Sequence, residues 1–249
     1  MTTTILSWPP QRVARTAGFG YLMIIVAGIF AEFIVRSGMI VPGDAAATTG
    51  NITASESLFR LGIAGDLVML IFDVIVALAL YVLLAPVSKG LALLATFFRL
   101  VHSAVVGASL LNLAIVLLLV GGTGAALAFP PAQLQELVML FLNAHSYGYV
   151  LGLAFFAFHC VLLGYLVYKS GFFPKILGAL LMLASIGYLV DSFAHVLLHD
   201  YADYAPVLMI VVFVPAFVAE MSFTIYLLTK GVKESKTGDG RREKSKGEQ

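Results

Sequence analysis

The sequence has few charged residues and a single cysteine. Asp, Glu, Lys and Arg together make up 12% of the 249 residues, whereas hydrophobic residues make up 60%. A water-soluble domain of this length needs more polar side chains to cover its surface. The one cysteine, Cys160, lies in an apolar run and cannot form a disulfide within the chain. The composition therefore excludes a soluble globular domain and an intrachain disulfide scaffold.

Common catalytic motifs are also missing. The sequence contains no nucleotide-binding loop, no nucleophile elbow and no serine-triad pattern. Glycines such as Gly18, Gly107 and Gly152 fit contacts between membrane helices, where small residues let two backbones approach. We therefore predict no cofactor and no nucleic-acid partner, and the residues favour a protein that is not an enzyme.

Long apolar segments fill most of the chain, whose mean hydropathy is +0.98. A membrane-spanning helix needs about 20 mostly apolar residues. In lipid such segments are helical, because no water is present to satisfy exposed backbone groups. The sequence predicts an all-α polytopic membrane bundle of six transmembrane helices, at residues 16–37, 58–84, 91–121, 137–168, 173–198 and 206–229.

The ends of the chain are polar. We expect a short N-terminal segment at 1–14, a transmembrane domain at 15–230 and a tail at 231–249. No signal-peptide cleavage site follows the first apolar run, so that run is expected to be retained. Seven of the fifteen Lys and Arg residues lie in the last twenty positions, which predicts a solvated, disordered basic tail.

The distribution of Lys and Arg predicts the orientation. With the N-terminus in the cytoplasm, twelve basic residues lie inside and two, Arg36 and Arg60, lie outside. We expect a multi-pass protein of the cell membrane with both termini in the cytoplasm. The outer segment after the first span contains the sequon Asn51-Ile52-Thr53, a three-residue pattern that is common by chance, so glycosylation of Asn51 stays open.

Several stretches carry a family resemblance. Residues 158–194 read FHCVLLGYLVYKSGFFPKILGALLMLASIGYLVDSFA, residues 15–22 read RTAGFGYL, and residues 98–100 read FRL. The chain resembles a family of prokaryotic multi-pass membrane proteins catalogued as a domain of unknown function (four-three-eight-six). The resemblance covers roughly residues 12–230 and implies about six helices and a membrane location. It implies no activity.

Four ionisable residues within the spans are predicted to lie at one depth, in the inner half of the membrane. These are Asp73, Arg99, His159 and Glu220, on four different helices. A guanidinium offers a fixed fork of donors that suits two carboxylates, so Arg99 is expected to pair with Asp73 or Glu220. In the alternative, Arg99 extends to the inner interface, because residues 101–122 suffice to span alone. The cluster is either functional or a structural link between helices.

A second polar layer is predicted in the outer half: Glu32, Asp66, His145, Asp191 and His195. Asp191, His195 and His199 follow one another at four-residue spacing, which places three candidate metal ligands along one helix. A straight helix cannot surround one ion, so we predict no tightly bound metal and a polar partner for Asp191 on a neighbouring helix. If a metal is bound, these three residues are the candidates.

Three functional classes follow from these features. The first is an accessory or small-ligand-binding bundle with a buried charged centre. The second is a small-solute or proton-coupled transporter, and the third is an intramembrane zinc hydrolase. The expected partners are the lipid bilayer and a small polar ligand, and the oligomeric state stays open.

Overall fold

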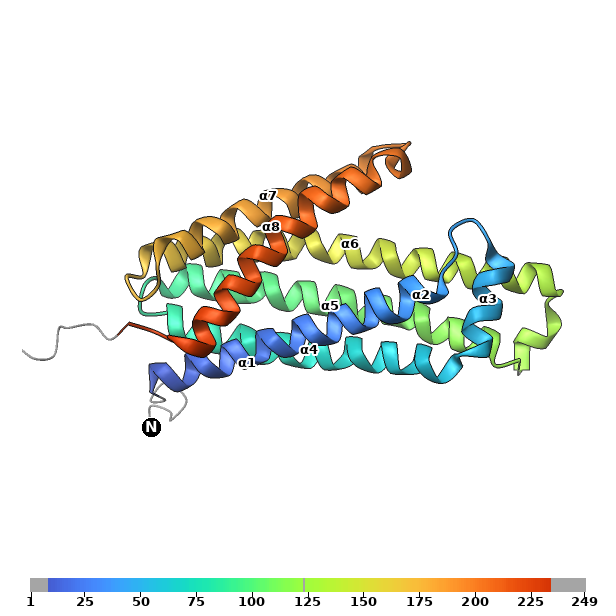
Figure 1. Cartoon of the computed structure of the whole chain (residues 1–249), viewed down its shortest axis with the longest axis horizontal. Coiled ribbons are helices and arrows are strands. Elements are labelled where there is room, and N and C mark those ends of the chain that lie inside the picture. Colours follow the sequence, from blue (N-terminus) through green and yellow to red (C-terminus); the bar gives the residue numbers. More distant parts are fainter. Residues whose placement is uncertain (1–8, 123, 234–249) are drawn as a thin grey trace, which may run out of the picture.

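The computed structural model describes residues 9–122 and 124–233, and within them the chain is helical without a strand. Three elements lie between or within the long helices: a three-residue helix α2 (Ser37–Met39), a short helix α3 (Ala45–Ala54) and a 3-10 turn η3 (Gly124–Ala128). The long elements are α1 (Pro10–Ile29) with its π-helical continuation η2 (Phe30–Arg36), α4 (Glu56–Leu84), α5 (Lys89–Val120), α6 (Pro131–Lys169), α7 (Lys175–Leu197) and α8 (Tyr201–Thr229) (Figure 1).

Six of these helices are long and apolar enough to cross a membrane, which confirms the predicted multi-pass bundle. The helices extend beyond the predicted spans. Helix α6 begins at Pro131 rather than at 137, and α1 begins at Pro10, because proline is well tolerated in the first turn, where its missing N–H is not needed. The stretch after the first span was expected to be only a break, yet it contains α3, whose first turn is capped by Asp44 Oδ1 accepting from Ala47 N at 2.8 Å.

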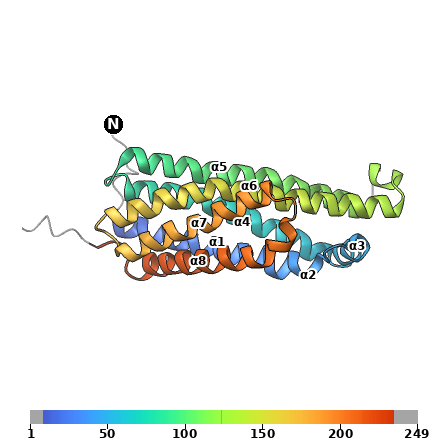
Figure 2. The ribbon, with the colours of Figure 1, turned by 90° about the horizontal axis from the view of Figure 1, so that it is seen from above.

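The six long helices form a closed ring. Helix α1 packs on α4, α4 on α5, α5 on α6, α6 on α7, α7 on α8, and α8 returns to α1. The start of α1 and the end of α8 lie at one end of the bundle, here called the terminal end (Figures 1 and 2). The opposite, distal end carries α3 and η3. The first and last residues that the structure describes therefore lie at the same end of the bundle.

The first residues of the predicted tail are packed rather than free. The side chain of Gln11 at the start of α1 donates to Lys230 O at 2.9 Å and accepts from Val232 N at 3.0 Å. Lys233 N donates to Phe172 O at 3.1 Å. The rest of the predicted tail and the first eight residues lie outside the described residues.

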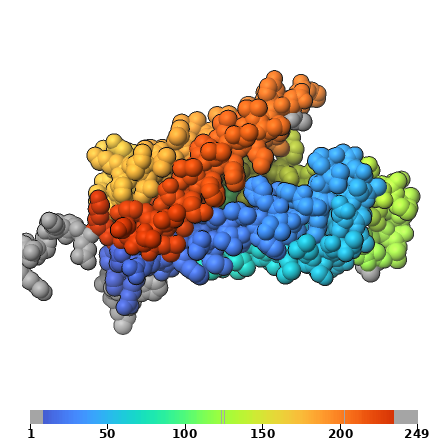
Figure 3. Space-filling model, in the orientation of Figure 1, coloured from blue at the N-terminus to red at the C-terminus, as the bar shows by residue number. Residues whose placement is uncertain are grey.

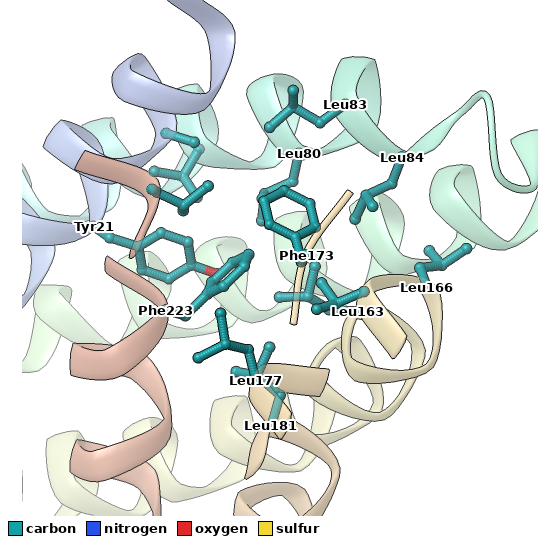
Figure 4. Close-up of a cluster of buried hydrophobic side chains, with 14 of the residues drawn as sticks. Tyr21, Leu80, Leu83, Leu84, Leu163, Leu166, Phe173, Leu177, Leu181 and Phe223 are labelled. Atoms are coloured by element: carbon teal, nitrogen blue, oxygen red, sulfur yellow. The ribbon is translucent and has the colours of Figure 1, made fainter. Parts of the chain in front are cut away.

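An apolar core closes the terminal half of the ring. Leu80, Leu84, Leu163, Phe173 and Phe223 come from three different helices and the α6–α7 turn, and they meet between the helices (Figure 4). Lipid tails are as apolar as leucine, so this core is held by close packing rather than by removal of apolar surface from water. The packing seals the interior of the ring toward the terminal end.

Helices α6 and α7 approach each other through two glycines. A Cβ added at Gly178 would lie 2.5 Å from Gly164 O, and one added at Gly164 would lie 2.6 Å from Gly178 O. No side chain larger than hydrogen fits at either position without moving the backbones apart. This contact fixes the distance between α6, which carries His159, and α7, which carries Tyr188. Both residues belong to the site described below.

We expect Gly178→Ala to destabilise the protein by about 1–3 kcal/mol relative to Gly107→Ala, because the added methyl overpacks a backbone contact. Gly107 is the matched control: its added Cβ would meet only Leu70 Cδ1 at 3.5 Å, an ordinary contact. Both changes gain the same helix propensity, so the comparison isolates the contact. The readout is thermal unfolding in detergent, followed by the reaction of a thiol dye with Cys160, which is 1% exposed in the fold. Equal melting temperatures for the two variants would refute the expectation.

The distal half of the ring is open on one side. Phe213 of α8 packs on Phe33 of η2 with ring centroids 5.5 Å apart, and beyond this contact α8 leans away from the bundle. From Asp203 to Val211, no residue whose side chain is described is buried, and Ile210 is 65% exposed. Figure 3 shows this face hollowed between α8 and the segment from α1 to α2. We call this hollow the lateral recess.

Candidate functional site

Arg99 of α5 is the centre of the buried polar contacts. It is 0% exposed, and its Nη2 lies 2.5 Å from Asp73 Oδ1 of α4, an ion-pair distance without the alignment of a hydrogen bond. Arg99 Nη1 donates to Tyr21 Oη of α1 at 2.9 Å and lies 3.0 Å from His159 Nε2 of α6. One side chain thus links four of the six spans.

The contacts of His159 define its protonation. A guanidinium only donates, so His159 Nε2 must accept from Arg99 and carries no hydrogen. The hydrogen then sits on Nδ1, which donates to Ala95 O at 2.8 Å. His159 is therefore a neutral imidazole in this arrangement, and it adds no charge to the cluster.

Aromatic rings enclose the guanidinium of Arg99. Its Cζ lies 4.8 Å from the centroid of the Tyr21 ring and 5.4 Å from that of Phe156. Cation–π contacts of this kind are strengthened where water is absent. The hydroxyl of Ser103 contacts Asp73 Oδ2 as a donor and also lies 3.0 Å from Arg99 O. The ion pair is therefore held in place from several sides.

The remaining two spans contribute a second contact at the same level. Tyr188 of α7 donates to Glu220 Oε1 of α8 at 2.8 Å. The Tyr188 ring packs edge-on against Phe156 at 5.5 Å, which connects this pair to the surroundings of Arg99. Each of the six spans thus gives one polar side chain to what we call the central cluster: Tyr21, Asp73, Arg99, His159, Tyr188 and Glu220.

The structure brings together three of the four residues that the depth argument placed in the inner layer. Asp73, Arg99 and His159 are in contact, and Arg99 points into the ring rather than to the interface. Glu220 is bonded to Tyr188 instead, and among the described residues it forms no ion pair with Arg99. Tyr21 and Tyr188 were missed, because membrane tyrosines are usually interfacial. The available signal was the position of Tyr188 in the middle of its predicted span, whereas Tyr21 lies near the start of its own.

Two nitrogen atoms at the central cluster lack a partner. Arg99 Nε and His102 Nδ1 are buried and have no hydrogen-bond partner among the described residues. The His102 ring lies 4.9 Å from that of Phe156, so it belongs to the same aromatic surroundings. A buried polar group without a partner costs about 1–3 kcal/mol in proteins. These two nitrogen atoms are therefore the positions at which an added hydrogen-bond partner would stabilise the network.

A second ion-pair cluster lies nearer the distal end. Arg36 Nη1 and Nη2 face Asp66 Oδ2 and Oδ1 of α4 at 2.5 and 3.2 Å, a bidentate pair, and Arg36 Nε donates to Glu32 Oε2 at 2.7 Å. Arg36 and Asp66 are buried, whereas the Glu32 side chain is 55% exposed. Glu32, Arg36 and Asp66 form what we call the distal cluster. It contains, like the central one, two carboxyl groups and one guanidinium.

Arg36 was predicted to lie at the outer end of the first span. It lies three residues before Met39, where that helix ends, and its side chain turns toward α4 to pair with Asp66, a contact that was not predicted. The π-helical turns of η2 belong to a class of segment that is frequent at functional sites. The hydropathy of the run does not show this contact, because it does not reveal where a charged side chain near a helix end points.

The other residues of the predicted outer layer form no ion pair with the distal cluster in the part of the chain that the structure describes. His145 is buried on α6, and its Nδ1 lies 3.2 Å from both the hydroxyl and the carbonyl oxygen of Ser109. Asp191 Oδ1 accepts from Tyr201 Oη at 2.8 Å, so Asp191 has the expected partner on a neighbouring helix. His195 packs between the rings of Tyr147 and Tyr201, with centroids at 4.4 and 4.2 Å.

Burial raises the pKa of Tyr201 to about 12, and the carboxylate of Asp191 adds to this shift. The hydroxyl therefore stays protonated, and continues to donate to Asp191, over the whole physiological range. As for the metal candidates, the described residues contain no group of three His, Cys, Asp or Glu placed to hold an ion. Asp191 and His195 are engaged with tyrosines instead, and His199 follows the end of α7.

The ring of six apolar helices around charged side chains defines a multi-pass α-helical membrane protein. The chain belongs to the family described as "Domain of unknown function (DUF4386)", which its residues 16–231 match. It is 35% identical over 173 residues to an "Uncharacterized protein" of Archaeoglobus fulgidus, a match that covers 70% of this chain and 85% of the relative. No solved structure matches the chain.

Proposed function

We propose that this protein binds a small polar ligand at the central cluster. The observation that carries the proposal is Arg99 Nε, a buried guanidinium nitrogen that has no hydrogen-bond partner among the described residues. Arg99 Nε–H can only donate, so the complementary ligand atom is an acceptor such as a carboxylate or carbonyl oxygen. A ligand that supplies this oxygen satisfies a donor that the protein leaves open.

The packing of the ring supports access from one side. The terminal half is filled by the apolar core, whereas the lateral recess opens the distal half between α8 and the first span. The carboxylate of Glu32, in the distal half, is half-exposed. A ligand is therefore expected to reach Arg99 from the distal end or from the adjoining bilayer.

The test uses acetate, glycine and methylammonium as probes for a carboxylate, a zwitterion and an amine. We expect acetate and glycine at matched ionic strength to raise the melting temperature of the purified protein, because a ligand that binds only the folded state stabilises it. Methylammonium should have no such effect. The matched variant is Arg99→Lys, which keeps the charge and loses the guanidinium Nε–H. If no probe shifts the wild type, or if the shift is unchanged in Arg99→Lys, the proposal fails.

One observation favours the transporter as a second function. A bundle that is packed at one half and open at the other has the one-sided form that alternating access requires. The zinc hydrolase has no such support. Its starting ligands Asp191 and His195 belong to no three-residue metal-ligating group among the described residues.

We also propose that the terminal end faces the cytoplasm of the cell. Arg12, Arg15, Lys89, Lys169 and Lys175 all lie at helix ends on the terminal side. The distal end carries Asp44, Glu136, Asp200 and Asp203, and Arg60 there is paired with Glu56. This asymmetry follows the positive-inside rule.

A reporter that is active only in the cytoplasm should work when fused after residue 249 and should be silent when inserted beside Asp200, between α7 and α8. Immunodetection of the two fusion proteins controls for a difference in their expression levels. Activity at Asp200 with silence at the C-terminus would reverse the proposed orientation.

A further inference from the structure

The charges of the central cluster do not balance. Asp73 and Glu220 are two carboxyl groups, Arg99 is one guanidinium, and His159 is neutral because its Nε2 accepts from Arg99. If both carboxyls were ionised, the cluster would keep one negative charge at membrane depth. A charge in that environment requires a partner or a counter-charge.

Glu220 is the carboxyl without a cation of its own. The titratable and charged groups around it come from every other span, and Arg99, already paired with Asp73, is the one cation among them. These groups are Tyr21 of α1, Asp73 of α4, Arg99 of α5, Tyr149 and Cys160 of α6, and Tyr188 of α7. Among the described residues, the Glu220 carboxyl has one hydrogen bond, from Tyr188 to Oε1, and Oε2 has none.

Glu220 lies at the junction of two parts of α8. Its side chain is half-buried in the bundle. It lies on α8 seven residues before Leu227, which is packed in the apolar core, and seven residues after Phe213, beyond which α8 leans away from the bundle. Glu220 therefore lies between the packed part of α8 and the part that borders the lateral recess.

We propose that Glu220 is a proton-binding site of the native bundle, and that its proton sets the partner of Arg99. Oε2 takes the proton, the carboxylate becomes a neutral carboxylic acid, and Oε1 keeps the hydrogen bond from Tyr188. With Glu220 neutral, Arg99 pairs with Asp73 alone, as the structure has it. With Glu220 ionised, a second carboxylate competes for the free Nε–H of Arg99.

A proton fits this site better than a metal cation. Hard cations need several oxygen ligands, whereas the described contacts of Glu220 supply the Tyr188 hydroxyl alone. A proton needs one carboxyl oxygen. The coupling of Glu220 to Arg99 rests on the proposed function, because the same Nε–H is the donor offered to the ligand. The protonation of Glu220 does not rest on the proposed function.

The direct test is infrared spectroscopy of the purified protein at neutral pH. We expect a C=O band of a protonated carboxylic acid that shifts in deuterium oxide and is lost in Glu220→Gln. The matched control is Asp191→Asn, since Asp191 also accepts from a single tyrosine hydroxyl, and it should keep the band. A spectrum unchanged by Glu220→Gln overturns the proposal.

Thermal unfolding gives a second measurement. The native state holds a proton that the unfolded chain releases above a pH of about 4.3, so the wild-type melting temperature should fall as the pH rises, relative to Glu220→Gln. The corresponding change in the folding equilibrium is at most about tenfold per pH unit for one proton. The same pH dependence in both proteins contradicts the proposal. A shift caused by sodium at constant pH, present in the wild type and absent in Glu220→Gln, overturns it in favour of a sodium site.

The acetate probe separates this proposal from the proposed function. If both hold, acetate stabilises the wild type at neutral pH, where Glu220 is neutral, and stabilises it less at a higher pH at which Glu220 is ionised, whereas Glu220→Gln shows the large effect at both pH values. If acetate fails at every pH while the infrared band behaves as expected, the ligand proposal is wrong and the proton site stands.

Discussion

Arg99→Ala is expected to destabilise the protein by about 3–5 kcal/mol, because it removes one partner of a buried ion pair. Asp73 would remain buried without a cation, and Tyr21 Oη and His159 Nε2 would lose their shared donor. Protonation of Asp73 would recover part of this loss. The melting temperature, followed by labelling of Cys160, measures the effect.

Arg60→Ala is the matched control for this experiment. Arg60 also forms an ion pair with a carboxylate, Glu56, but its side chain is 58% exposed, so its removal should cost at most about 1 kcal/mol. A double change, Arg99→Met with Asp73→Leu, should recover much of the lost stability, because no charge is left stranded. Equal effects of Arg99→Ala and Arg60→Ala would show that the central ion pair does not stabilise the bundle.

Arg36→Ala should lower the free energy of unfolding by a similar amount, about 3–5 kcal/mol, because the bidentate partner Asp66 is buried and would be left without a cation. Glu32→Gln is its control within the same cluster. The Glu32 side chain is 55% exposed, so its loss should cost at most about 1 kcal/mol. If Glu32→Gln were as damaging as Arg36→Ala, the burial of Asp66 would not be the source of the effect.

The six spans could be predicted from the sequence because lipid imposes both length and helicity on an apolar run. The ends of the helices could not. Pro10 and Pro131 begin helices that the hydropathy pattern starts later, and α3 forms in a stretch whose composition resembles a loop. Helix ends depend on local capping and on contacts beyond the membrane core, which an average over hydropathy does not contain.

The depth of a charged residue was enough to place Asp73, Arg99 and His159 together, because a guanidinium in hydrocarbon must find an acceptor. The partner of Glu220 was not predictable in the same way. It depends on how α8 closes the ring against α7, and Tyr188 carries no charge to reveal it. The Arg36–Asp66 pair was missed for a different reason, since Arg36 near the outer end of the predicted first span was counted only as a charge outside the membrane.

That π-helical segment has an evolutionary consequence. Each hydrogen bond of a π turn spans one residue more than that of an α turn, so residues 30–36 hold a surplus residue relative to a regular helix. Deleting that surplus residue would convert the segment to a regular α-helix and leave Arg36 on the side of Asp66. A deletion in the regular part of α1, between Tyr21 and Ile29, would instead turn Arg36 by about 100° around the axis relative to Tyr21. A one-residue gap in a relative's sequence would thus be compatible with the ion pair at residues 30–36 and would mark its loss a few positions earlier.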